Sequence, residues 1–279
     1  MTAASQGGVR LWLQAGDIYQ RAKESWIYDT YWKFADRRIV DDRRKEIAFY
    51  RGLLQGFQKG NLIFDIGANH GYKTGMFLKL GARVIAVEPD DQSRKVLRQR
   101  FVKYRLMPRP LVIVNKAVSD KACVERMWID TPGSAKNTLN RKWAETLRTD
   151  ESRFGERLSF DQWREVSTVS MEELIAEHGL PFFVKIDVEG HELQVLRGMN
   201  RPVPYLSFEV NLPEFRNEGM ECVHILERLD QNGTFNYTAD CRSGLVSSTW
   251  LGAQKFSAVL SSCREKSIEV FWKTTAAQA

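Results

Sequence analysis

The sequence has few cysteines and no metal-binding pattern among them. The four present lie far apart, with neither a CxxC pair nor the spacing of metal ligands: Cys123, Cys222, Cys241 and Cys263. A chain of 279 residues that is 43% hydrophobic can bury a sizeable core without disulfide bonds. We therefore expect reduced thiols in a cytoplasmic protein.

Long hydrophobic runs and concentrated charge are also missing. No stretch of about 18 apolar residues occurs, so no membrane span is expected. The first residues lack a charged segment followed by a long apolar one, so no signal peptide is expected. The 41 basic and 35 acidic residues give a net charge of +6, and the basic ones are spread along the chain. This distribution indicates a mildly basic solvated surface and argues against a nucleic-acid partner.

The segments that are present alternate between apolar runs and helical patterns. We interpret residues 1–57 as an N-terminal helical cap and residues 58–279 as the main domain, because glycines interrupt the helical pattern before the first apolar run. Strands that alternate with helices predict an α/β fold with a mostly parallel sheet covered on both faces. Residues 131–165 show little apolar rhythm and are expected to form a long functional or mobile loop. Strands are expected at 62–64, 84–87, 111–114, 124–129 (antiparallel to its predecessor), 166–169, 182–187, 203–210, 235–238 and 268–272, and helices at 72–80, 90–103, 171–178, from about 189, and at 222–230.

A glycine-containing loop follows the first apolar run. Residues 61–90 read as strand, loop, helix and strand, with Gly67 and Gly71 in the loop. Glycines there permit positive φ angles and a close approach of the backbone to a ligand at the helix N-terminus. The dinucleotide fingerprint G-x-G-x-x-G is broken, because Asn69 and Tyr72 replace its second and third glycines. The loop therefore argues against NAD and favours a ligand without a pyrophosphate, such as S-adenosylmethionine (SAM). A tight turn with no ligand is the alternative.

Acidic residues end the later strands of the predicted sheet. Glu88 follows the second strand, where a carboxylate can accept hydrogen bonds from ribose hydroxyls, although a helix-dipole role is the alternative. Asp187 should emerge at the same sheet edge, and Glu209 adds an acid to that rim. Glu189 is explained by the dipole of the next helix alone. His191 is a weaker acid–base candidate, for which a plain surface position is the alternative.

Four segments in this order resemble the FkbM family of SAM-dependent methyltransferases: IFDIGANHGYKT, VIAVEPD, NKAVSD and VKIDVEGHELQVLRG. The resemblance covers roughly residues 61–211, and D-V-E-G-x-E-x-x-L-x-G is its most specific element. It implies a class I Rossmann-like fold with a mostly parallel seven-stranded sheet. It also implies SAM as cofactor, S-adenosylhomocysteine (SAH) as product, and O-methylation of a hydroxyl on a small molecule or sugar.

The resemblance further implies roles for individual residues. Glu88 would hold the ribose, Ala117 and Val118 would lie near the adenine, and Asp187 would lie near the reacting methyl group. The methionine end of SAM would be lined by Asp65, Gly67, Asn69, Gly71 and Thr74.

Methyl transfer to a hydroxyl needs a base within hydrogen-bond reach. Asp187 is the first candidate, with Glu209 and His191 behind it. A divalent cation held by Asp187 and Glu209 is an alternative, although no ligand spacing compels a metal. Two other functions stay open, namely a methyltransferase acting on RNA or protein and a non-catalytic SAM-binding module. We expect a small-molecule or carbohydrate partner, and the motifs specify neither the acceptor nor an oligomeric state.

Overall fold

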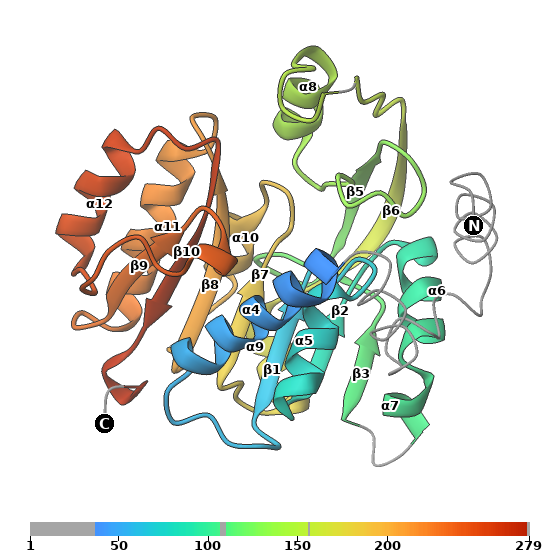
Figure 1. Cartoon of the computed structure of the whole chain (residues 1–279). Coiled ribbons are helices and arrows are strands. Elements are labelled where there is room, and N and C mark those ends of the chain that lie inside the picture. Colours follow the sequence, from blue (N-terminus) through green and yellow to red (C-terminus); the bar gives the residue numbers. More distant parts are fainter. Residues whose placement is uncertain (1–36, 107–109, 156, 278–279) are drawn as a thin grey trace.

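A seven-stranded sheet forms the centre of the computed structural model, which describes residues 37–106, 110–155 and 157–277 (Figure 1). Its strand order is β3-β2-β1-β7-β8-β10-β9. The strands from β3 to β8 in this order are parallel, and β10 runs antiparallel to both of its neighbours. The predicted mostly parallel sheet is therefore confirmed. The strand bounds are β1 (Leu62–Ile66), β2 (Arg83–Val87), β3 (Leu111–Val114), β7 (Phe183–Ile186), β8 (Tyr205–Asn211), β9 (Thr234–Thr238) and β10 (Ser267–Lys273).

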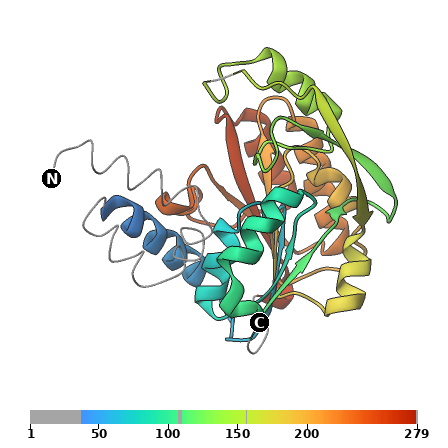
Figure 2. The ribbon, with the colours of Figure 1, turned by 90° about the vertical axis from the view of Figure 1, so that its right-hand side faces the viewer.

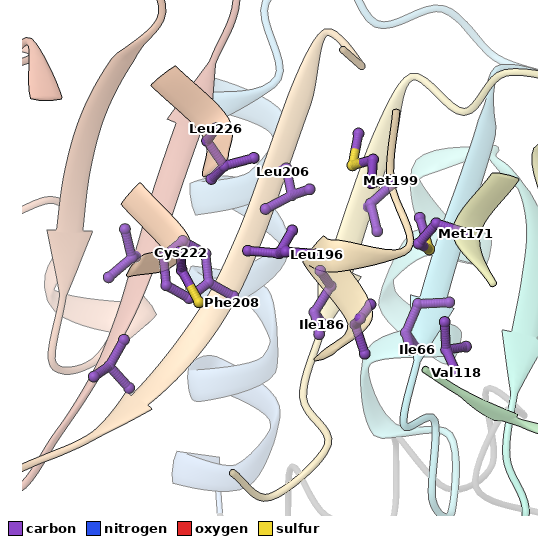
Figure 3. Close-up of a cluster of buried hydrophobic side chains, with 14 of the residues drawn as sticks. Ile66, Val118, Met171, Ile186, Leu196, Met199, Leu206, Phe208, Cys222 and Leu226 are labelled. Carbon is purple, nitrogen blue, oxygen red and sulfur yellow. The ribbon is translucent and has the colours of Figure 1, made fainter. Parts of the chain in front are cut away.

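Helices cover both faces of this sheet, as predicted. Successive side chains of a strand point to opposite faces, so Ile63 and Phe64 of β1 belong to two different buried clusters. The Ile63 cluster packs under α4 (Arg37–Leu53), α5 (Tyr72–Leu80) and α6 (Asp91–Arg100), which α7 (Val102–Leu106) follows. The Phe64 cluster packs under α9 (Met171–His178), α10 (Glu192–Arg197), α11 (Arg216–Leu229) and α12 (Ala253–Ser262), and Figure 3 shows part of it.

The predicted N-terminal cap is described only in part. Residues 1–36 lie outside the described residues, and α4 begins at Arg37. Tyr50, Leu53 and Leu54 of α4 and its C-terminal continuation are buried in the same cluster as α5. In the described ranges, none of the helices combines the length and the hydrophobicity that crossing a membrane requires.

A small second sheet corrects one of the predictions. The strand at 124–129 exists as β5 (Val124–Ile129), but it pairs antiparallel with β6 (Gln162–Val169) and not with β3. The sheet order is β4-β6-β5, where β4 is Ala117–Val118. Alternation alone could not choose between the two pairings, because both place one face of β5 against the core.

The expected long loop at 131–165 is also wrong in part, because it contains α8 (Arg141–Thr149). The Asn140 side chain caps this helix by accepting a hydrogen bond from the Trp143 N–H. Trp143, Ala144 and Leu147 are its buried residues, a stripe too short to stand out in the sequence. Both views place α8 at the top of the molecule, beyond the main sheet (Figures 1 and 2). Helix α12 was not predicted either.

Candidate functional site

The loop after β1 contacts the end of β7 directly. Gly67 has φ 80°, and a Cβ atom there would lie 1.8 Å from the carbonyl oxygen of Asp187. Gly71 has φ 78°, and a Cβ atom there would lie 2.5 Å from side-chain atoms of Leu97 and Phe101. Both glycines are thus required by close packing within the protein. This packing brings the ends of β1 and β7 together and leaves Gly71 outside the cavity described below.

Glu88 lies at the end of β2 against this loop and is 6% exposed. The backbone N–H groups of Asn69 and Asp90 each donate to one of its carboxylate oxygens at 2.7 Å. Burial raises the pKa of Glu88 to about 7, although the two N–H groups oppose that shift. Each oxygen keeps a second lone-pair direction, so the carboxylate can accept further hydrogen bonds from a ligand.

Asp65 and Thr74 lie beneath the loop. The Thr74 hydroxyl donates to the Asp65 carboxylate, and both residues are almost fully buried. Burial also raises the pKa of Asp65. The pair connects β1 to the first turn of α5 and lies outside the lining of the cavity. The pair therefore stabilises the loop from below.

One cavity collects most of the predicted site residues. It extends from the β1 loop past Glu88 to β4 on one side and to the end of β7 on the other. The second sheet closes it with Met127, and the 131–165 segment contributes Leu139. Among its lining residues are the predicted Gly67, Asn69, Glu88, Ala117, Val118, Asp187 and His191.

Asp187, directly after β7, is paired with a lysine of the same strand. Lys185 Nζ lies 2.7 Å from Asp187 Oδ2. Burial favours the neutral acid, but the Lys185 ammonium outweighs this effect and holds the pKa of Asp187 below its usual value. The side chain of Asp187 remains 39% exposed. It is therefore an accessible, ionised and weakly basic carboxylate.

Glu189 belongs to the site, contrary to the dipole interpretation. It precedes α10 in a left-handed turn with φ 52°, so it is not in the first helical turn. Trp143 Nε1 of α8 donates to its carboxylate at 3.2 Å, and the Thr138 hydroxyl donates to its backbone carbonyl at 2.6 Å. Burial and the neighbouring Glu209 raise the pKa of Glu189 to about 8. The E-G pair after a strand end was the available signal for this turn.

Three carboxylates meet at the ends of β7 and β8. One oxygen each from Asp187, Glu189 and Glu209 lie within 4.8 Å of one another. Glu209 Oε1 accepts from the Ser267 hydroxyl at 2.6 Å, and burial followed by the charge of Asp187 raises its pKa. Such a group could hold a divalent cation or take up a proton from a substrate.

His191 also lines the first cavity. Its Nε2 atom is 3.1 Å from the hydroxyl of Ser119 and 3.9 Å from a carboxylate oxygen of Glu125. Burial lowers the pKa of His191, although Glu125 opposes that shift. The structure therefore places it with Ser119 and apart from the three clustered carboxylates.

A second cavity begins at Asp187 and extends away from the first. It lies between α4, α5 and the ends of β8, β9 and β10. Sequence reasoning did not connect Lys73 or Glu269 to the site. Lys73 lies within the IFDIGANHGYKT segment but received no role there, and Glu269 lies on β10, remote from β7 in the chain and outside every quoted segment. Its lining residues are Glu46, Lys73, Lys185, Asp187, Glu209, Thr238, Ala239, Asp240, Cys241, Ser267, Ile268 and Glu269.

Comparisons with known proteins bear on the family and the fold of this chain. A family model described as the methyltransferase FkbM domain matches residues 65–237. The hexuronic acid methyltransferase AglP of Haloferax volcanii is 24% identical over 173 residues, which are 61% of this chain and 63% of that protein. The crystal structure of methyltransferase FkbM from Methylobacillus flagellatus KT has a TM-score of 0.50 at 13% identity, over 81% of this chain and 47% of that one. The chain thus spans less than two thirds of the length of either relative.

Proposed function

The chain belongs to the FkbM methyltransferase family, and on that premise we propose that it transfers a methyl group from SAM to a hydroxyl oxygen of a small molecule or sugar. One observation carries the proposal. The β1 loop, Glu88 and Asp187 line a single cavity at the carboxyl ends of parallel strands, where open α/β sheets bind their ligands.

The chemistry of this cavity fits SAM. Glu88 offers two carboxylate oxygens, already oriented by backbone N–H groups, to the hydroxyls of a ribose. Ala117, Val118 and Met127 offer an apolar surface to a flat base. These are the roles that the resemblance assigned to Glu88, Ala117 and Val118.

SAM supplies an activated methyl group, so the new carbon–oxygen bond forms as the carbon–sulfur bond breaks, and the sulfur keeps the electron pair as SAH leaves. The protein must then align the acceptor, exclude water and accept the hydroxyl proton. Glu209 suits the proton better than Asp187, since its pKa is raised whereas the Lys185 ammonium lowers that of Asp187. We therefore assign Glu209 as the base that accepts the hydroxyl proton and Asp187 as the residue that orients the acceptor.

The named relative supports a carbohydrate acceptor. AglP is described as a hexuronic acid methyltransferase, so its acceptor is a sugar with hydroxyl groups. The second cavity of this chain is lined by side chains that form hydrogen bonds, among them Asp187 and Thr238. Binding of a hydroxylated molecule requires such groups.

Titration calorimetry with SAM and SAH tests the cofactor site. The wild-type protein should bind both, and Glu88→Ala should weaken binding by at least about tenfold, since hydrogen bonds to a charged group contribute roughly 1.5–3 kcal/mol. Glu151→Ala is the matched control, because Glu151 is exposed and is not one of the residues that line the cavity. Thermal melting of each variant establishes that it is folded. Absence of SAM and SAH binding to the wild-type protein would contradict the proposal.

Transfer itself is measured with methyl-labelled SAM and fractionated cell extract, followed by mass spectrometry of the labelled product. A label on a hydroxyl oxygen of a small molecule or glycan supports the proposal. A label on RNA or protein would replace it with the corresponding alternative. SAM binding without a labelled product in any fraction would indicate a non-catalytic SAM-binding module.

A further inference from the structure

The two cavities share Asp187 as a common wall. A methyl donor in the first and an acceptor in the second would therefore meet at this residue. The second cavity includes Glu209, to which we assigned the hydroxyl proton, and extends from there toward β9 and β10. It is thus in the position that an acceptor must occupy.

Acids outnumber bases in the lining of the second cavity. Five carboxylates line it, from Glu46, Asp187, Glu209, Asp240 and Glu269, against two ammonium groups, from Lys73 and Lys185. Both lysines already have partners, since Lys73 is paired with Glu46 and Lys185 with Asp187. Asp240 is paired with Arg242, which lies outside the lining. These pairs leave Glu209 and Glu269 as the carboxylates that face the cavity without a close ionic partner among the described side chains.

Glu269, on β10, is held by neutral donors. Its Oε1 atom accepts from the Ser207 hydroxyl at 2.8 Å and from the Tyr50 hydroxyl at 3.3 Å. Its Oε2 atom lies 3.1 Å from the Cys241 thiol. The Lys73 and Lys185 ammonium groups overcome the effect of burial and hold the pKa of Glu269 below its usual value. Glu269 is therefore ionised, its direct hydrogen-bond partners are neutral groups, and the closest ion pairs of the two ammonium groups are with Glu46 and Asp187.

A partly enclosed carboxylate of this kind favours a cation and disfavours a second anion, because both charges are poorly screened there. A uronate or phosphate in this cavity would face Glu209 and Glu269 with both nearby ammonium groups already paired. A protonated amine would instead complete an ion pair with Glu269. Hydroxyl groups on the same molecule could then reach Asp187 and Glu209.

We propose that the second cavity binds the methyl acceptor, that this acceptor is a hydroxylated compound of the amino-sugar type, and that Glu269 selects it by binding its protonated amine. The inference rests on the proposed function, because a methyl acceptor can react only next to a bound methyl donor. It assigns Glu269 to specificity, whereas Glu209 takes part in the transfer.

Three methyl glycosides that share one ring test this selectivity: methyl glucosaminide, methyl glucoside and methyl glucuronoside. Each is titrated at pH 7 into the full chain saturated with SAH, and binding is followed by ligand-observed NMR. The glucosaminide should bind about tenfold more tightly than the glucoside, since a charge-assisted contact contributes roughly 1.5 kcal/mol or more. The glucuronoside should bind more weakly than either. With SAM in place of SAH, kcat/KM should rank the three in the same order.

Glu269→Gln should abolish the preference for the amine and keep SAH affinity. Glu265→Gln is the matched control, because it removes the same charge from an exposed position on the loop before β10. The comparison of the three glycosides on the wild-type protein decides the question even if Glu269→Gln fails to fold.

The outcomes separate this inference from the proposed function. Failure to bind SAM or SAH contradicts the proposed function. Normal SAH binding with no bound glycoside, with equal affinities, or with a preference for the glucuronoside contradicts the amine-selective acceptor site. Retention of the amine preference in Glu269→Gln would contradict the role of Glu269.

Discussion

The indole N–H of Trp143 lies 3.2 Å from the carboxylate of Glu189, and this contact ties α8 to the turn after β7. Thr138 and Asn140, from the residues just before α8, donate to the backbone carbonyls of Glu189 and Gly190. The inserted segment thus holds the end of β7 from outside the main sheet. This segment lies outside the sequence motifs, yet it contacts the turn that directly follows Asp187.

Trp143→Phe removes the donor to Glu189 and keeps an aromatic ring in a fully buried position. We expect the free energy of unfolding to fall by about 1–3 kcal/mol, through the lost hydrogen bond and the smaller side chain. Methyl transfer should fall by more than SAM affinity, because Glu189 clusters with Asp187 and Glu209, the carboxylates that we assign to the acceptor and to its proton. Urea unfolding and steady-state kinetics measure the two effects. Trp163→Phe, at a 44% exposed position, is the control and should change neither.

Gly67→Ala tests the contact between the β1 loop and β7. An alanine Cβ would lie 1.8 Å from the Asp187 carbonyl oxygen, so the two strand ends must separate. We expect a loss of at least about 3 kcal/mol in the free energy of unfolding, a size typical of severe steric and backbone conflicts, together with loss of SAM binding.

Gly56→Ala is the matched control for that variant. Gly56 has φ 79°, nearly equal to the 80° of Gly67, but nothing lies within 4 Å of the added Cβ. Its cost should be limited to the backbone strain of roughly 1–2 kcal/mol. Chemical denaturation of both proteins gives the difference, and equal losses would show that strain alone explains the effect at Gly67.

Much of this fold could be predicted from local patterns. Buried parallel strands are continuous apolar runs, so β1, β2 and β7 were visible, and the glycine loop and Glu88 follow from their positions at strand ends. The pairing of β5 was not visible, because register and partner depend on tertiary packing. The second cavity was hidden for the same reason. Glu269 joins Asp187 and Lys73 in one cavity lining only because β10 inserts between β8 and β9.

The pH dependence of SAM binding should follow the protonation of the Glu88 carboxyl. Burial raises its pKa to about 7, so the carboxyl becomes protonated as the pH falls through 7 and loses the charge that favours ribose hydroxyls. We expect binding to be nearly constant above pH 8 and about tenfold weaker at pH 6, as follows from single-site protonation at that pKa. Calorimetry from pH 5.5 to 8.5 measures the curve, and Glu88→Gln should flatten it. A wild-type affinity that does not change over this range would contradict the assignment.

Metal removal separates a carboxylate base from cation catalysis. The cation alternative draws support from the close approach of Asp187, Glu189 and Glu209. We nevertheless expect activity to survive dialysis against EDTA, because the Lys185 ammonium, the Trp143 indole and the Ser267 hydroxyl already hold these three carboxylates. Loss of activity that added Mg²⁺ or Mn²⁺ restores would favour the cation.

Replacing each of the two acids that face the acceptor by its amide tests which of them accepts the hydroxyl proton. Glu209→Gln keeps the shape and the contact with Ser267 but cannot take up the hydroxyl proton. We expect kcat to fall by roughly 10²-fold or more, in the range of general-base catalysis, while SAM affinity stays within about twofold. Asp187→Asn should instead weaken both kcat and acceptor binding, because it leaves the buried Lys185 ammonium without its partner. Single-turnover rates and SAM titrations distinguish the two variants. Suppose instead that Glu209→Gln keeps the wild-type rate, while Asp187→Asn loses activity and still binds SAM and acceptor normally. The base is then Asp187, the first candidate of the sequence analysis.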